Sequence, residues 1–248
     1  SVKHTGSDTR VGGTAQTLPT LTTTGQATVP NRVDGLEEPQ NVPPINRYRL
    51  QSLKTETGST ITVSYKTSSC SRTSPPKEDA DTQACYPVRW SPPGYTAPIL
   101  DWFYTYPVTE VDETDATTAK STPHVTTYEY KGGAAWHHDD SELTVDKNRT
   151  WDQFRGYAQV VTRVGAGSDP VTEEVTDYLR GMDGDATAAG GTASVKVTDA
   201  VGDTLTDDNA LAGYDYQTTV YDKDGGSPQS QSVNHPWMSP VTATHVRG

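Results

Sequence analysis

The stretch "RYRLQSLKTETGSTITVSY" (residues 47–65) decides the fold class of this 248-residue chain. Apolar side chains recur at every second position on both sides of its polar centre: Tyr48, Leu50, Ile61, Val63 and Tyr65. A period of two is typical of a half-buried β-strand, and a glycine-containing turn between two such runs predicts a β-hairpin. We place the turn at residues 56–59, where Gly58 can adopt a positive φ.

The same order of strand, polar turn and strand returns toward the C-terminus. Hairpins are expected at residues 155–181, 192–207 and 213–233, with turns rich in glycine and aspartate. Residues 124–133 are expected to pair with the strand that precedes them. Repeated hairpins without intervening helices predict an all-β fold of antiparallel strands.

Prolines punctuate the segment from residue 85 to residue 111 and exclude a helix there. We expect residues 99–111 to form one strand with an irregularity at Pro107. Residues 141–154 are the one stretch whose sequence permits a short helix. Helix is therefore a minor element of the predicted fold.

The composition favours a thin sheet over a thick two-layer core. The hydrophobic fraction is 32% and the mean hydropathy is -0.70, yet 13 Tyr and 5 Trp argue against a disordered chain. An antiparallel sheet that buries one face and covers the other with threonine suits such a sequence. We divide the chain into an extended, loop-rich lead-in at residues 1–45 and a β-sheet segment at residues 46–248.

The charge of the chain excludes several classes of partner. The formal net charge is -12 and the pI is about 4.8, whereas binding of nucleic acid or of an anionic membrane requires a basic surface. No apolar run approaches the roughly 20 residues that a transmembrane helix needs. The chain begins "SVKHTGSDTR" without Met or a signal peptide, and we expect it to be a segment of a longer protein.

Cys70 and Cys85 are the two cysteines of the chain, and they flank a polar loop with two prolines. In a secreted protein they would form a disulfide, and closing a loop of about 15 residues is worth about 3 kcal/mol. The alternative is a pair of unrelated reduced thiols. We expect the disulfide, because the chain offers neither cysteine another partner.

The stretch "WHHDD" (residues 136–140) concentrates metal ligands. His137, His138, Asp139 and Asp140 are candidate ligands of Zn²⁺ or Ca²⁺. In a strand, however, adjacent residues point to opposite faces, and the i, i+4 histidine spacing of a helical zinc site is absent. The alternative, which we favour, is a structural turn with a hydrogen-bonded histidine and no cofactor.

Other acidic and aromatic residues have both a structural and a functional interpretation. "GMDGD" with Asp183 and Asp185 resembles part of a calcium loop, but the glutamate of an EF-hand is missing, so we expect a glycine turn. The acidic turns at residues 110–115 and 199–208 are expected to be solvated tips. We expect the following aromatic side chains to form the core rather than an exposed glycan-binding row: Trp90, Trp102, Phe103, Tyr104, Trp136, Trp151 and Trp237.

Successive blocks of residues 45–248 resemble, in the same order, the secreted bacterial RHS/YD-repeat proteins, in the region that precedes their main repeat array. The blocks are "RLQSLKTETGSTITVSY", "CYPVRWSPPG", "DWFYTYPVTEV", "YEYKGGAAWHHDD", "TWDQFRGYAQV", "YLRGMDGD", "DNALAGY" and "HPWMSPVTAT". "FRGYAQV" is also similar to a segment of Tc toxin B components, and "YDYQTTVYDKDGG" (residues 214–226) to one degenerate YD unit. A tandem YD array and a self-cleaving C-terminal core are absent from the sequence, so no proteolytic activity is carried over.

The resemblance implies a structural role without enzymatic activity. Such proteins, like the related teneurins, curl a long antiparallel sheet into a hollow shell that encapsulates the C-terminal toxin of the same chain. It implies a secreted or cell-surface protein whose partner is the remainder of its own chain. Two alternatives are open: a carbohydrate-binding or adhesion module that contacts a cell-surface glycan, and a glycan hydrolase, although no nucleophile elbow or distinct carboxylate pair is present.

Overall fold

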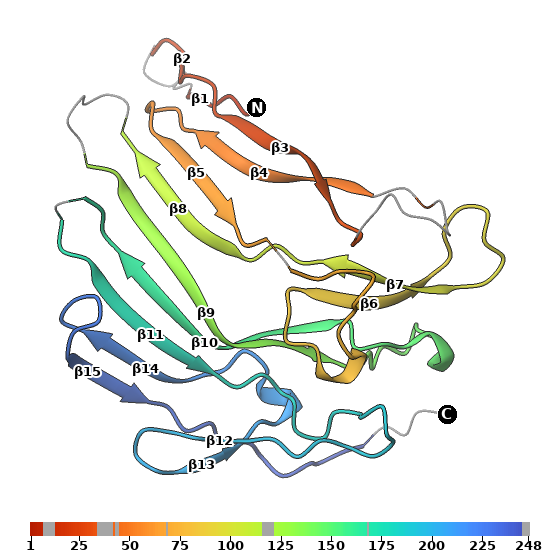
Figure 1. The fold of residues 1–248 in the computed structure, drawn as a ribbon. Coiled ribbons are helices and arrows are strands. Elements are labelled where there is room, and N and C mark those ends of the chain that lie inside the picture. The colour runs from red at the N-terminus through yellow and green to blue at the C-terminus, as the bar shows by residue number, and fades with distance from the viewer. Residues whose placement is uncertain are drawn as a thin grey trace.

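The computed structural model describes residues 1–6, 13–33, 42, 45–67, 69–115, 122–167 and 169–244. The described chain is all-β, as predicted, and nine antiparallel strands form one large sheet in the order β15-β14-β11-β10-β9-β8-β5-β4-β3 (Figure 1). The strands are β3 (Thr22–Pro30), β4 (Asn46–Lys54), β5 (Thr60–Tyr65), β8 (Val108–Thr114), β9 (His124–His137), β10 (Gln153–Val164), β11 (Thr172–Tyr178), β14 (Asp215–Tyr221) and β15 (Pro228–Val233).

Three two-stranded sheets complete the strands. They pair β1 (Thr5–Gly6) with β2 (Gln16–Thr17), β6 (Cys85–Trp90) with β7 (Ile99–Tyr104), and β12 (Lys196–Thr198) with β13 (Thr204–Thr206). In Figure 1 the β6–β7 hairpin lies beside the ends of β8 and β9, and the β12–β13 hairpin lies at the bottom of the view, below β14 and β15.

The hairpins expected from the sequence are confirmed. Strands β4 and β5 pair with Ser52 opposite Thr62, and Gly58 in their turn has a φ of 98°. Hairpins β10–β11, β12–β13 and β14–β15 follow at the expected positions. Strand β9 pairs with β8, with Thr127 opposite Glu110.

The prediction of a single strand at residues 99–111 is wrong. The segment forms two strands in different sheets: β7 pairs with β6, whereas β8 pairs with β5. The break falls on Thr105, Tyr106 and Pro107, where the proline lacks an N–H and has a fixed φ. The helix considered at residues 141–154 is limited to a three-residue 3-10 turn, Asp146–Asn148.

The buried core includes two small hydrophobic clusters. The first contains Val33, Cys70, Cys85 and Trp102, and a disulfide joins the two cysteines with a Cα–Cα distance of 6.4 Å. The second contains Ala134, Trp136 and Tyr157, with Tyr86, Tyr130 and Trp151 packed against it. Both clusters lie where the β6–β7 hairpin meets its neighbours, so this hairpin supplies the second layer of the fold.

The lead-in is attached to both parts of the fold. Strand β3 forms one edge of the large sheet, with Thr23 opposite Leu53 of β4. Beyond β3, Arg32 and Val33 are fully buried, and the Val33 N–H donates to the Trp102 carbonyl at 2.8 Å. The division of the chain at residue 45 stays a prediction.

The large sheet is open. It is neither closed nor strongly curled, in contrast to the curl expected from the resemblance. Because β3 and β15 lie at its two ends without pairing to each other, curvature within this segment is insufficient to complete a shell. In the described part of the chain, no helix is long and apolar enough to cross a membrane.

Candidate functional site

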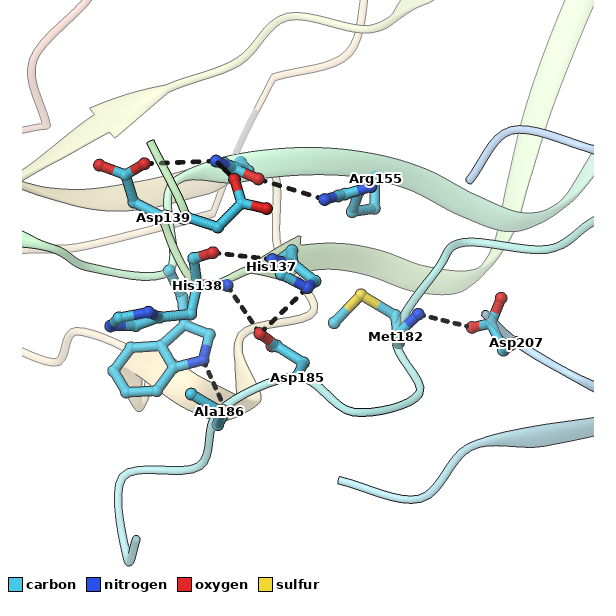
Figure 2. A network of polar contacts seen from close by, with 11 residues as sticks. His137, His138, Asp139, Arg155, Met182, Asp185, Ala186 and Asp207 are labelled. Atoms are coloured by element: carbon cyan, nitrogen blue, oxygen red, sulfur yellow. Dashed lines mark hydrogen bonds and ion pairs between the residues drawn. The ribbon is translucent and has the colours of Figure 1, made fainter. Parts of the chain in front are cut away.

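The "HHDD" stretch lies at the end of β9, where the strand meets the loop of residues 180–186 (Figure 2). His137 is buried, and its Nδ1 lies 2.7 Å from the His138 carbonyl oxygen. Since a carbonyl only accepts hydrogen bonds, Nδ1 is the donor in this contact. The other ring nitrogen, Nε2, lies 3.4 Å from Oδ1 of Asp185, so both nitrogens of His137 face partners within the protein.

His138 points to a different neighbour. Its backbone N–H donates to Oδ1 of Asp185 at 3.0 Å, while its ring meets Trp151 edge-on with a centroid separation of 4.8 Å. The Trp151 indole N–H in turn donates to the Ala186 carbonyl at 3.1 Å. Figure 2 shows these contacts fastening the end of β9 to the 180–186 loop.

The two aspartates that follow are held by backbone and amide donors. Oδ1 of Asp139 accepts from the Ser141 N–H at 2.8 Å and from the Gln153 side chain at 3.3 Å. The same Gln153 amide donates to Asp140 at 2.8 Å. Burial opposes the charge of Asp139, but hydrogen bonds from Thr144, Ser141 and Gln153 hold the pKa of its carboxyl below the usual range.

These geometries separate the four candidate ligands from one another. His137 faces Asp185, His138 faces Trp151, and Asp139 caps the turn that follows it. Within the described ranges, the three-ligand group that converges closely enough for an ion lies elsewhere and contains none of the four. The arrangement at residues 137–140 thus braces a turn, and the four candidate ligands of Zn²⁺ or Ca²⁺ do not share one coordination point.

The loop that receives His137 is organised by Asp207. One carboxylate oxygen of Asp207 accepts from the N–H groups of Arg180 and Gly181, at 2.6 Å and 2.7 Å, and the other accepts from Met182 at 3.1 Å. Gly181 and Gly184 have φ values of 71° and 83°, as expected of the glycine turn in "GMDGD". A buried carboxylate therefore aims Asp185 at the histidines.

The expectation that residues 199–208 form only solvated tips is wrong for two aspartates. Asp199 and Asp207 are buried, with 5% and 1% of their surface exposed. Asp207 accepts from residues 180–182 and Asp199 contacts His235, all of them distant in the sequence, although Asp199 also accepts from Val201 and Asp203 in its own turn. Local polarity identified the turn, but the burial of these carboxylates depends on long-range packing.

The aromatic side chains expected in the core differ in burial. Trp102, Phe103 and Trp136 are buried, Trp90, Tyr104 and Trp151 are half-buried, and Trp237 is 83% exposed. On the open sheet, a concave groove of about 450 Å³ is lined by the rings of Tyr106, Tyr130, Phe154, Tyr157 and Tyr178, with Arg155 beside them. This groove was not predicted, because its residues come from four separate segments.

A buried carboxyl group, Asp81, and a half-buried one, Asp152, give a prediction for pH dependence. Burial raises the pKa of Asp81 to about 6, and burial together with the charge of Asp139 raises the pKa of Asp152 to about 6. The native state then holds these protons more tightly than the unfolded chain, whose carboxyl pKa is about 4. This stabilisation is fully present below pH 4 and is lost as the pH rises through about 6, by up to about 1.4 kcal/mol per carboxyl and pH unit.

We therefore expect Asp81→Asn to reduce this dependence. The amide keeps an oxygen to accept the Gln83 N–H, which lies 2.7 Å from Oδ1. Between pH 7.5 and pH 5, the unfolding free energy of the variant relative to the wild type should fall by about 1–2 kcal/mol, as measured by urea denaturation. The control is Asp146→Asn, because that side chain is 89% exposed; a similar slope for both variants would contradict the assignment.

Comparison of the chain with protein-family models, with curated proteins and with solved structures found no match.

Proposed function

We propose that this chain is a non-enzymatic wall segment of a larger secreted protein of the RHS/YD type, where it contributes to a β-sheet shell around a C-terminal toxin. The observation that carries the proposal is that the large sheet is broad, yet several of its strands have no residue buried by another part of the described chain. Among the strands that the structure describes, β4, β5, β8 and β15 contain no buried residue.

The accessible surface supports an additional contact on this sheet. The chain exposes 15078 Å², whereas a compact protein of its 26.8 kDa mass exposes about 10,800 Å². In β10, Tyr157 and Val161 are the two buried residues of a 12-residue strand. A soluble sheet with so much half-covered surface is typical of one layer in a larger assembly.

The chemistry of the chain suits a wall outside the cytosol. The Cys70–Cys85 disulfide is typical of an oxidising compartment. His137, Asp139 and Asp207 brace β9 and its neighbouring loops: the His137 ring contacts the His138 carbonyl, and the two carboxylates accept from backbone N–H groups. This use of histidine and aspartate supports a structural role over a catalytic one.

The test of the wall proposal uses the longer protein that it implies. Limited proteolysis of that protein, with residues 46–248 present or deleted, should leave the C-terminal domain resistant only when the segment is present. A second form carrying Trp136→Ala tests whether an intact fold of the segment, and not its mere presence, gives the protection. Equal resistance of all three forms would overturn the proposal.

One observation favours a second candidate, a carbohydrate-binding module. The 450 Å³ groove presents several aromatic rings and one arginine, and 45% of the Phe154 surface is exposed. Aromatic faces beside a few polar groups suit the binding of a sugar ring. Retention of the chain on immobilised polysaccharides, lost in Phe154→Ala and kept in Trp237→Ala, would support this candidate over the wall.

A further inference from the structure

Three side chains outside the "HHDD" region converge on one point. Asp199 and Asp203 flank the turn of the β12–β13 hairpin, and His235 comes from the segment that follows β15. One ligand atom from each residue lies within 4.8 Å of the other two. Nε2 of His235 is 2.6 Å from Oδ2 of Asp199 and 3.8 Å from Oδ2 of Asp203.

The turn itself aims the first carboxylate. Oδ1 of Asp199 accepts from the N–H groups of Val201 and Asp203, at 3.0 Å and 2.9 Å, which leaves Oδ2 directed at His235. The Asp199 side chain is completely buried, whereas those of Asp203 and His235 are 66% and 44% exposed. The group is thus anchored on one side and open to solvent on the other.

Strand β14 holds both ligand-bearing segments in place. On one side, the side chain of Gln217 accepts from the Ala200 N–H at 2.7 Å. On the other, the Asn234 N–H donates to the Tyr216 carbonyl at 2.8 Å, directly before His235. The ligands therefore come from two segments that are already ordered relative to each other, which lowers the entropic cost of binding.

The two carboxylates lie on the same ring nitrogen at different distances. Oδ2 of Asp199 is at hydrogen-bond distance from Nε2 of His235, whereas Oδ2 of Asp203 lies 3.8 Å from it. The neighbouring sequence adds further negative charge, because residues 197–222 contain four aspartates besides these two and no lysine or arginine. A divalent cation would neutralise both carboxylates at once.

The donor set and spacing fit a tetrahedral ion. Zinc bonds of about 2.0–2.2 Å place neighbouring ligand atoms about 3.4 Å apart, between the observed 2.6 Å and 3.8 Å. One imidazole and two carboxylates suit Zn²⁺ or a related transition metal, whereas Mg²⁺ and Ca²⁺ prefer oxygen ligands alone. The fourth position is open for water.

We propose that Asp199, Asp203 and His235 bind one Zn²⁺ ion, which clamps the segment after β15 onto the β12–β13 hairpin. The ion links residues 36 apart in the sequence, the separation of Asp199 and His235. Zinc binding by the excised chain does not depend on the wall role, so either proposal can fail without the other.

The test is a Zn²⁺ titration of the chelator-treated chain by calorimetry at pH 7.5, with Co²⁺ absorption as a report of tetrahedral geometry. We expect one ion per chain and a higher melting temperature with Zn²⁺. His235→Gln and Asp203→Asn should each weaken binding at least about tenfold and remove the shift in melting temperature. The control is His124→Gln, whose exposed histidine lies at the start of β9.

Asp203→Asn separates the metal from a simple ion pair, because it leaves the His235–Asp199 contact intact. If the three residues form only that pair, Zn²⁺ will not raise the melting temperature of any form. Unchanged Zn²⁺ affinity in His235→Gln and Asp203→Asn would place the ion elsewhere. Either result overturns the proposal.

Discussion

Replacing Asp101 with alanine should lower the free energy of unfolding by about 3–5 kcal/mol, because it removes a buried carboxylate that pairs with a fully buried arginine. Arg32 has none of its surface exposed, and Asp101 has 1%. The Arg32 Nε–H donates to Oδ2 of Asp101, and its Nη1–H donates to the Val42 carbonyl at 2.9 Å. The Trp90 indole N–H, 3.3 Å from the same carboxylate oxygen, would also lose its acceptor.

Urea denaturation followed by tryptophan fluorescence measures this loss. The control is Asp146→Ala, which removes an exposed ion pair with Arg149 and should cost less than about 1 kcal/mol. The double variant Arg32→Met/Asp101→Leu should recover much of the loss, since apolar replacement of a buried pair is often neutral. If Asp101→Ala and Asp146→Ala have equally small effects, the buried Arg32–Asp101 ion pair is not needed for stability, which would contradict the prediction.

The same pair has a consequence for the organisation of the chain. Arg32 follows β3 in the lead-in, whereas Asp101 lies in β7, so the pair fastens these two regions together. Protease sensitivity at residues 22–33 should therefore rise together with the loss of stability in Asp101→Ala. The sequence did not indicate that Arg32 is buried, because its neighbours in the chain are residues typical of loops.

The hairpins could be predicted because each is determined by neighbours in the sequence. Alternating side chains mark the two faces of β5, and Gly58 supplies the turn, whereas Tyr48 and Leu50 of β4 are exposed. The split of residues 99–111 could not be predicted in the same way. Pro107 marked an irregularity, but whether a strand continues or enters another sheet depends on which partner it meets.

The site residues show the same limit. The histidines and aspartates at residues 137–140 were conspicuous because they are adjacent in the sequence. Adjacent side chains at the end of a strand point in different directions, however, so they contact different partners. Asp199 and His235 converge although they are 36 residues apart. The signal available in the sequence was the "DAVGD" turn, which explains how Asp199 is oriented but not what it meets.

Trp136→Ala is expected to cost about 3–5 kcal/mol of unfolding free energy, because it opens a cavity at the junction of the two layers. The indole is 4% exposed and lies 5.0 Å from the Tyr86 ring of β6 and 4.9 Å from the Phe154 ring of β10. Its N–H donates to the Gln83 carbonyl at 3.0 Å, an acceptor that the variant leaves unpaired.

Differential scanning calorimetry distinguishes this junction from an ordinary core position. Trp136→Phe keeps a ring but loses the donor to Gln83, so its loss should be intermediate, whereas Trp237→Ala, at an 83% exposed position, should change stability by less than about 0.5 kcal/mol. Because the β6–β7 hairpin contacts the sheet through this cluster, Trp136→Ala should also broaden the transition or divide it in two. A single sharp transition at the wild-type temperature would show that the hairpin is held to the sheet by other contacts.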